Sequence, residues 1–292
     1  MRPPISPEIL PPDDFDLGLV ASDIDGTLLL NWKPISTATI DAIHRCQGAG
    51  IPFVLVTGRP MRWLAPIAEQ IPDLGRVVCL NGAVVYDIAS QSVVDAHTID
   101  SQSLTEITAA VRVDHPEARF AYETLNGGFI DREFVTGRPR EARIIDDVSE
   151  LAGEDVVKVL VRLETSDSQA MHDLIDPLVD GTCHASFSEP DNGLVELAPF
   201  GITKAKTLED LCDHLGVARS QVMAFGDMPN DIEMIEWVEH GIVMGQSKDE
   251  LKGLASVVTD SVDDDGLAVA LVDYFDLDSS LLDAVSTTNT RP

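Results

Sequence analysis

Pairs of carboxylates, together with single hydroxyl, amine and amide groups, follow several apolar segments of this 292-residue chain. The first group is Asp23-Ile24-Asp25-Gly26-Thr27, directly after the apolar segment 17–22. Two carboxylates two residues apart, before a turn that contains glycine, can reach one site and bind a hard divalent cation such as Mg²⁺. One of them can also attack phosphorus to give an aspartyl-phosphate. For this motif alone, the alternative is a solvated acidic turn.

A second group, Thr57-Gly58-Arg59, follows the apolar segment 52–56. A hydroxyl and adjacent backbone N–H groups, at the junction between a strand and a helix, suit a phosphate oxygen. A turn with a helix cap explains the same three residues equally well.

A lysine and a further acidic loop complete the set. Lys204 stands at the start of a predicted helix in a chain with only six lysines, and Lys206 is its competitor. The loop is Gly226-Asp227-Met228-Pro229-Asn230-Asp231, which follows the apolar segment 222–225 and has a proline suited to start a helix. An ordinary loop capped by aspartate is the alternative for this motif. It does not explain why four junctions each carry groups that suit a phosphate–metal site.

The elements that must position these groups alternate between strand and helix. This rhythm predicts right-handed strand–helix–strand units and a parallel sheet, and ligands of such sheets bind beyond the carboxyl ends of the strands. The predicted strands are 17–22, 52–56, 77–80, 222–225, 241–244 and 256–258, and the predicted helices include 36–49, 204–215, 231–238 and 266–274.

The middle of the chain differs from both ends. A hairpin is predicted at 84–94, followed by helices at 104–113 and 168–178 and strands at 119–122, 156–163 and 182–187. This pattern predicts an α+β insert with antiparallel strands between the halves of a doubly wound core. We therefore expect flexible ends at 1–16 and 276–292, a core of 17–84 and 191–275, and an insert of 85–190.

Charge and composition limit the partners. The net charge is −30, with 50 acidic against 20 basic residues, so nucleic acid and anionic membranes are disfavoured and any phosphate site must be a local exception. An acidic, lysine-poor surface could also reflect salt adaptation. No apolar run is long enough to cross a bilayer, and no secretory signal is visible. Four scattered cysteines indicate reduced thiols, so we expect a cytoplasmic protein.

The four motifs, in this order, resemble those of the haloacid dehalogenase (HAD) superfamily of phosphatases. The insert resembles the large α/β cap of the Cof-type subfamily (class IIB caps), and Asn81-Gly82-Ala83 matches the usual entry to that cap. The resemblance implies a Rossmann-like parallel-sheet core with an inserted α+β cap. One small departure is Ala205, where the subfamily often has glycine.

The resemblance also implies roles for the motif residues. Asp23 would be the nucleophile and Asp25 the acid/base, and Asp23 and Asp227 would bind Mg²⁺ with the backbone carbonyl of Asp25. Asp231 would support the lysine and the metal. Phosphate would be held by Thr57, Gly58, Lys204 and Asn230. Candidates for contacting the rest of the substrate are Arg59, which is structural or cap-facing, and the cap-turn residues Glu123, Asn126, Gly127, Arg132 and 188–192.

The expected activity is Mg²⁺-dependent hydrolysis of a small phosphorylated metabolite, a sugar phosphate or similar compound, through an aspartyl-phosphate. Two alternatives remain at this point. One is a phosphomutase of the related type, which returns the phosphoryl group to its product. The other is a catalytically silent metabolite-binding protein with the same fold. Oligomeric state and the particular substrate are not encoded in any recognisable pattern.

Overall fold

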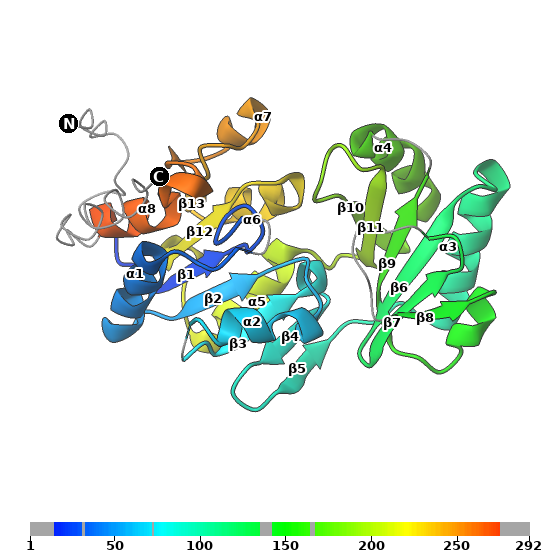
Figure 1. Ribbon diagram of the computed structural model, residues 1–292, viewed down its shortest axis with the longest axis horizontal. Coiled ribbons are helices and arrows are strands. Elements are labelled where there is room, and N and C mark those ends of the chain that lie inside the picture. The colour runs from blue at the N-terminus through cyan, green and yellow to red at the C-terminus, as the bar shows by residue number, and fades with distance from the viewer. Residues whose placement is uncertain (1–14, 31–32, 72, 135–141, 164–166, 275–292) are drawn as a thin grey trace, which may run out of the picture.

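The computed structural model describes residues 15–30, 33–71, 73–134, 142–163 and 167–274, which form two β-sheets that lie side by side (Figure 1). Most of the predicted flexible segment 1–16 and all of the predicted tail 276–292 lie outside the described residues. Within the described ranges, no helix combines the length and apolar character that a membrane crossing requires.

The larger sheet has eight strands in the order β14-β13-β12-β1-β2-β3-β4-β5. The neighbours from β14 to β3 run parallel, and the hairpin of β4 and β5 is added antiparallel to β3. The strands are β1 Leu19–Ser22, β2 Phe53–Val56, β3 Arg76–Cys79, β4 Val84–Asp87, β5 Ser92–Ala96, β12 Val222–Gly226, β13 His240–Val243 and β14 Val257–Val258.

Helices cover both faces of this sheet. Alternate residues of β1 point to opposite faces, so that Val20 packs in the cluster with α1 and α8, while Leu19 packs in the cluster with α5 and α6. The doubly wound core is thereby confirmed. The helices of this part are α1 Thr37–Gly48, α2 Ala65–Ala68, α5 Lys204–Leu215, α6 Ile232–Trp237, α7 Asp249–Lys252 and α8 Gly266–Tyr274.

Local sequence explains where two of these helices begin and end. The Ser36 hydroxyl accepts a hydrogen bond from the Thr39 N–H (3.0 Å) and so caps α1. The Thr203 hydroxyl caps α5 in the same way, and Gly216, with φ of 71°, ends it. Lys204 is consequently fixed in the first turn of α5.

The smaller sheet has six strands in the order β10-β11-β9-β6-β7-β8, all antiparallel except β7 with β8. Helices α3 and α4 pack against one face of it in a single apolar cluster. The opposite face turns toward the larger sheet's loops. The elements are β6 Arg119–Thr124, β7 Gly127–Asp131, β8 Ala142–Ile145, β9 Val156–Arg162, β10 Cys183–Ser186, β11 Leu194–Pro199, α3 Ser101–Asp114 and α4 Ser168–Val179.

The predicted limits of the insert, 85 and 190, do not coincide with the boundaries between the two sheets. The hairpin of β4 and β5 extends the larger sheet, and β11 belongs to the smaller one between β10 and β9. The hairpin at 84–94 was predicted as part of the insert, but an alternating pattern is the same whichever sheet it joins, so the sequence pattern alone does not decide its sheet. Strands β7, β8 and β11 were not predicted. Short 3₁₀ helices lie at Met61–Trp63, Leu80–Gly82, Val148–Leu151, Arg219–Gln221, Pro229–Asp231 and Val262–Asp264.

Candidate active site

Three of the predicted motifs meet at the carboxyl ends of three adjacent strands. Asp23 follows β1, Thr57 follows β2 and Asp227 follows β12, and β1 lies between the other two strands. The Asp23 N–H continues the ladder to the Phe225 carbonyl (3.0 Å). The parallel register therefore brings together residues that are far apart in the sequence.

Lys204 joins this group from the first turn of α5. Its ammonium group contacts Oδ1 of Asp23 (2.6 Å) and Oδ1 of Asp231 (2.7 Å), and all three side chains are buried. Lys206, the competitor, points away and pairs with Glu209 and Asp210 on the surface of the same helix. Of these two lysines, Lys204 is the one that contacts the Asp23 carboxylate.

Burial and crowding of like charge perturb the acids. Burial raises the pKa of Asp23 to about 7 against the opposing charge of Lys204, with Asp231 and Asp25 adding to the rise. Burial also raises the pKa of Asp227 to about 8, again helped by Asp231 and Asp23. Lys204 is held as a cation, because Asp23 and Asp231 outweigh its own burial and raise its pKa. One lysine thus faces three buried carboxylates, which favours binding of a further cation.

The oxygen donors fit Mg²⁺. One oxygen each from Asp23, Asp227 and Asp231 lies within 4.8 Å of the others, and carboxylate oxygens are the ligands this ion prefers. Asp231 already uses Oδ1 for Lys204 and Oδ2 for the N–H groups of Asp227 and Met228 (both 3.0 Å). The Thr27 hydroxyl donates to Oδ1 of Asp227 (2.8 Å). Asp23 and Asp227 are consequently the better ligands, and Asp231 positions the loop and the lysine.

Asp25 lies apart from this carboxylate cluster. Both of its oxygens accept from the Arg59 guanidinium, each at 2.6 Å, while Arg59 is buried and the Asp25 side chain is 46% exposed. Arg59 was predicted to be structural or to face the cap, and it holds the carboxylate of the predicted acid/base. The Arg59 N–H also donates to the Thr57 hydroxyl (3.1 Å), which leaves the hydroxyl proton for another acceptor.

The loop after β3 links the predicted motifs to the smaller sheet. Asn81, in the left-handed region with φ of 59°, accepts from the Asn230 amide (3.4 Å) and donates to Oε2 of Glu196 on β11 (2.6 Å). Lys158 on β9 donates to the same Glu196 oxygen (2.7 Å) and to the Gly58 carbonyl (3.2 Å). Burial acts to raise the pKa of Glu196, but Lys158 and Asn81 hold it below its ordinary value.

Lys158 and Glu196 were missed by the sequence analysis. Each is the single charged residue within the apolar part of its strand, in Val-Val-Lys-Val-Leu-Val and Leu-Val-Glu-Leu-Ala-Pro. A lone charge in an apolar strand was the signal that could have found them, because such charges are rarely buried unless they are paired.

The predicted cap residues divide into two groups. Glu123 lines the cavity above the motifs and pairs with Arg62 of the core (2.7 Å), and Ser188, Glu189 and Asn192 line it too. Asn126 and Arg132 do not line this cavity. Asn126 lies in the turn after β6, where its N–H contacts the Thr124 hydroxyl, and Arg132 pairs with Asp146 on the surface.

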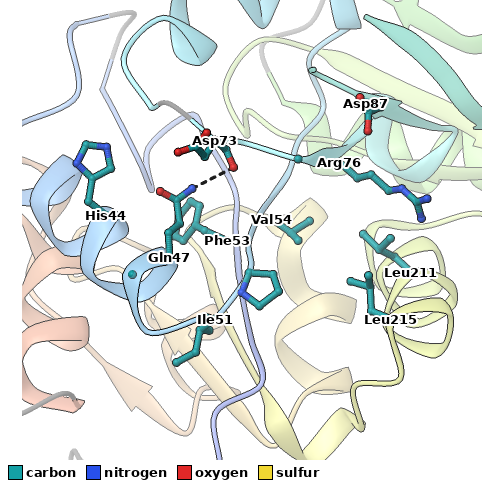
Figure 2. A pocket seen from close by; sticks show the side chains of 14 residues that line it. His44, Gln47, Ile51, Phe53, Val54, Asp73, Arg76, Asp87, Leu211 and Leu215 are labelled. Carbon is teal, nitrogen blue, oxygen red and sulfur yellow. Dashed lines mark hydrogen bonds between the residues drawn. The ribbon is translucent and has the colours of Figure 1, made fainter. Parts of the chain in front are cut away.

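The cavity itself has a volume of about 510 Å³ and lies between the motif loops and the open face of the smaller sheet. A wider groove of about 920 Å³ lies near the opposite ends of β2 and β3 (Figure 2). Figure 2 shows His44, Gln47, Asp73 and Arg76 around it, and none of the motif residues. Ligands of such sheets bind at the carboxyl ends of the strands, so the smaller cavity is the candidate active site.

Comparison with known proteins agrees with this assignment. The family model described as haloacid dehalogenase-like hydrolase matches residues 20–271, and the chain belongs to this family. The predicted family and fold class are thereby confirmed.

Relatives and solved structures extend the agreement beyond the core. The chain is 30% identical over 266 residues to the 5-amino-6-(5-phospho-D-ribitylamino)uracil phosphatase YitU of Bacillus subtilis, covering 89% of this chain and 98% of YitU. The structure of BT1666, a phosphatase of this superfamily from Bacteroides thetaiotaomicron, matches with a TM-score of 0.78 and 26% identity, over 93% of this chain and 100% of that one. The subclass IIB sugar phosphatase BT4131 matches with a TM-score of 0.76 and 21% identity, over 89% and 99%, and shows the fold, including the cap. The smaller sheet with α3 and α4 is called the cap below.

Proposed function

We propose that this protein is a Mg²⁺-dependent phosphomonoester hydrolase that transfers the phosphoryl group of a small phosphorylated metabolite to Asp23 and then to water. The observation that carries the proposal is the buried contact of Lys204 with Asp23 and Asp231, next to Asp227 at the end of the neighbouring strand. It brings a nucleophile, a fixed cation and a second metal ligand to one point.

In the first step each core residue has a separate role. An Asp23 carboxylate oxygen attacks phosphorus in line with the ester oxygen, the P–O bond to the alcohol breaks, and Asp25 gives a proton to the departing alkoxide. Lys204, the Thr57 hydroxyl and the Gly58 and Asn230 groups hold the phosphoryl oxygens. Bound Mg²⁺, held by Asp23, Asp227 and the Asp25 backbone carbonyl, would lower the repulsion between the carboxylate and the phosphate.

Water completes the cycle in the second step. Asp25, now deprotonated, takes a proton from a water molecule, and the water oxygen attacks the phosphorus of the aspartyl-phosphate. The bond between phosphorus and the Asp23 oxygen breaks, inorganic phosphate leaves and the carboxylate is restored. Arg59 would orient the Asp25 carboxylate in both steps through the paired contacts at 2.6 Å.

The name of YitU, which covers nearly the same length, supports a small phosphorylated metabolite as the substrate class. A net charge of −30 disfavours nucleic acid as a partner. A cytoplasmic location is part of the proposal, and the four free, buried cysteines agree with it.

A phosphate-release assay with Mg²⁺ over a panel of phosphorylated metabolites tests the proposal. We expect inorganic phosphate from at least one compound, no bisphosphate intermediate, and loss of release in Asp23→Asn. Formation of a bisphosphate with return of the phosphoryl group to product would instead establish the phosphomutase. Tight metabolite binding without turnover would establish the silent binding protein.

A further inference from the structure

Leu80, Asn81 and Gly82, which follow β3, all have left-handed backbone conformations, with φ of 55°, 59° and 107°. A bulky residue such as leucine rarely has a positive φ, and such strain persists only where the surrounding contacts enforce it. Here the Leu80 N–H donates to the Arg59 carbonyl (3.2 Å). The Asn81 N–H donates to the Thr57 carbonyl (3.0 Å). The strained turn therefore holds Asn81 against the loop after β2.

The Asn81 side chain is 4% exposed and bridges the cap and a second core loop. Its Nδ2 donates to Oε2 of Glu196 (2.6 Å), and its Oδ1 accepts from the Asn230 amide (3.4 Å). Lys158 and Asn81 hold the pKa of Glu196 below its ordinary value, so this carboxylate only accepts hydrogen bonds. Glu196 consequently fixes which end of the Asn81 amide faces the cap, and the oxygen of that amide is directed at Asn230.

The same Glu196 oxygen continues these contacts to the loop after β2. It accepts from Nζ of Lys158 (2.7 Å), and this ammonium group also donates to the Gly58 carbonyl (3.2 Å). Gly58 follows β2 and Asn230 follows β12, while β1, which leads to Asp23, lies between these two strands. Two core groups proposed to hold phosphate are therefore joined to each other through the cap.

Asn81 itself does not line the active-site cavity, whereas the residues that it links all do: Gly58, Lys158, Glu196 and Asn230. Asn81 thus lies behind the groups that face a ligand and can affect phosphate only through them. If its contacts served only to attach the cap, their loss would change stability and leave the affinity for phosphate as it was.

We propose that Asn81 is a positioning residue that makes the phosphate-binding loops of the core depend on the cap. It fixes the Asn230 amide directly. It reaches the Gly58 carbonyl through the Lys158–Glu196 pair. Groups that are fixed in advance lose less freedom on binding, so this positioning raises the affinity for phosphate itself. The inference rests on the proposed hydrolase function and adds to it a contribution of the cap to phosphate binding.

Orthophosphate tests this role, because it has no alcohol part for the cap to contact. Calorimetric titration with orthophosphate, at saturating Mg²⁺, therefore measures the phosphate end alone. Asn81→Gly removes the side chain, while glycine tolerates the left-handed backbone and leaves the charge unchanged. We expect orthophosphate to bind about fivefold to tenfold more weakly to this variant, as for the loss of one or two hydrogen bonds. An unchanged affinity would overturn the inference.

Gln91→Gly is the matched control for the backbone. Gln91 also has a left-handed conformation, with φ of 51°, and it is exposed in the turn before β5. This variant should keep the wild-type affinity for orthophosphate, and thermal unfolding reports how far each glycine lowers Tm. Equal weakening of orthophosphate binding in both glycine variants would assign the effect to the backbone and contradict the positioning role.

Exchanging the polar groups of Asn81 and Glu196 tests whether they act on each other. Asn81→Asp alone places two carboxylates at the 2.6 Å contact, and orthophosphate should bind more weakly by about tenfold or more. Adding Glu196→Gln restores a donor opposite the new carboxylate and returns the net charge to that of the wild type. The double variant should therefore recover a large part of the affinity. No recovery would contradict an action of Asn81 through Glu196.

Comparison of binding with turnover separates this inference from the hydrolase proposal. Orthophosphate binding that depends on Asn81, in a protein that hydrolyses no phosphorylated compound, would support the positioning role and contradict hydrolysis. Hydrolysis by a protein whose orthophosphate affinity is the same with and without the Asn81 side chain would contradict the positioning role alone. A wild-type protein that binds no orthophosphate with Mg²⁺ present would contradict both.

Discussion

The ammonium group of Lys158 lies 2.7 Å from a carboxylate oxygen of Glu196, and the two residues are only 2% and 7% exposed. Both belong to the cap, yet each also contacts the core, Lys158 through the Gly58 carbonyl and Glu196 through Asn81. Burying an ion pair gains little stability by itself, because both charges lose their hydration. The pair is better explained as a fixed contact between the cap and the core loop after β2.

Removing one partner of this pair should be more harmful than removing both charges. Lys158→Met leaves the Glu196 carboxylate buried without its cation, and we expect the free energy of unfolding to fall by about 3–5 kcal/mol. The double variant Lys158→Met/Glu196→Gln should recover a large part of that loss. Urea unfolding of the two single variants and the double variant measures the coupling, and additive losses would show that the two charges do not interact.

Leaving-group chemistry separates the roles of Asp23 and Asp25. With p-nitrophenyl phosphate, whose leaving group needs little protonation, Asp25→Asn should release about one equivalent of nitrophenol and then stall, because hydrolysis of the aspartyl-phosphate needs the base. Asp23→Asn should give no burst, and its turnover should fall roughly a thousandfold or more. Stopped-flow absorbance records both. Steady turnover without a burst in Asp25→Asn would contradict its role, and circular dichroism checks that both variants are folded.

Removing Arg59 should lower activity most for substrates whose leaving group needs a proton. Arg59→Ala frees the Asp25 carboxylate, so we expect kcat for an alkyl phosphate to fall by about a hundredfold, within the range of general acid catalysis. The loss with p-nitrophenyl phosphate should be much smaller. An equal loss for both substrates would show that Arg59 acts on phosphate binding or on the fold and not through Asp25.

Gly26 should be intolerant of any side chain. Its φ is +93°, and an added Cβ would collide with the Asp227 carboxylate, so Gly26→Ala should lose both Mg²⁺ affinity and activity. Gly50 has a similar φ of +82° with open space around it, so Gly50→Ala carries the backbone strain without the collision. Calorimetric Mg²⁺ titration and phosphate release compare the two. Equal effects would assign the loss to backbone strain alone.

Metal binding should depend on pH in a defined direction. The pKa values of Asp23 and Asp227, raised from 3.8 to about 7 and about 8, mean that the folded, metal-free protein keeps protons that the unfolded chain has released. Its stability therefore falls as pH rises between about 4 and about 8. Mg²⁺ displaces those protons, so the gain in Tm from Mg²⁺ over EDTA should grow from about pH 6 to about pH 8.

Two variants test the origin of this pH dependence. Asp227→Asn removes one of the two perturbed acids and should flatten the growth of the Mg²⁺ gain with pH. Asp249→Asn changes a fully exposed aspartate and should leave the growth intact. A gain that is constant or that shrinks with rising pH in the wild-type protein would contradict the assignment of these ligands.

Strand ends were predictable because they depend on local patterns. Asp23, Thr57 and Asp227 each follow a short apolar run, and parallel strands bring such ends to one edge of a sheet whatever the connecting segments are. Lys204 was predictable from the start of a helix and from the rarity of lysine. What the sequence could not provide was the partner of Asp25, since Arg59 reaches it through the fold and not through spacing along the chain.

The cap was predicted less well for a physical reason. Strand β11 has a glutamate at its centre, and β7 begins with two glycines, so neither has the clean alternation of a half-buried strand. Strand β11 takes its place by pairing with β9, which is distant in sequence, whereas β7 pairs with β6 directly before it. Pairing with β3 assigns the hairpin of β4 and β5 to the core.

Alternation along β9 has a consequence for how this enzyme could evolve. Val159 and Val161 pack into the cap's own interior, whereas Leu160 and Arg162 line the active-site cavity. Neighbouring positions of β9 therefore face different environments, the interior of the cap and the candidate active-site cavity. Mutagenesis libraries at the cavity-lining positions Leu160, Arg162 and Leu194, which keep the Lys158–Glu196 pair, should alter substrate selectivity while the proposed phosphoryl-transfer residues, all on the core, stay as they are.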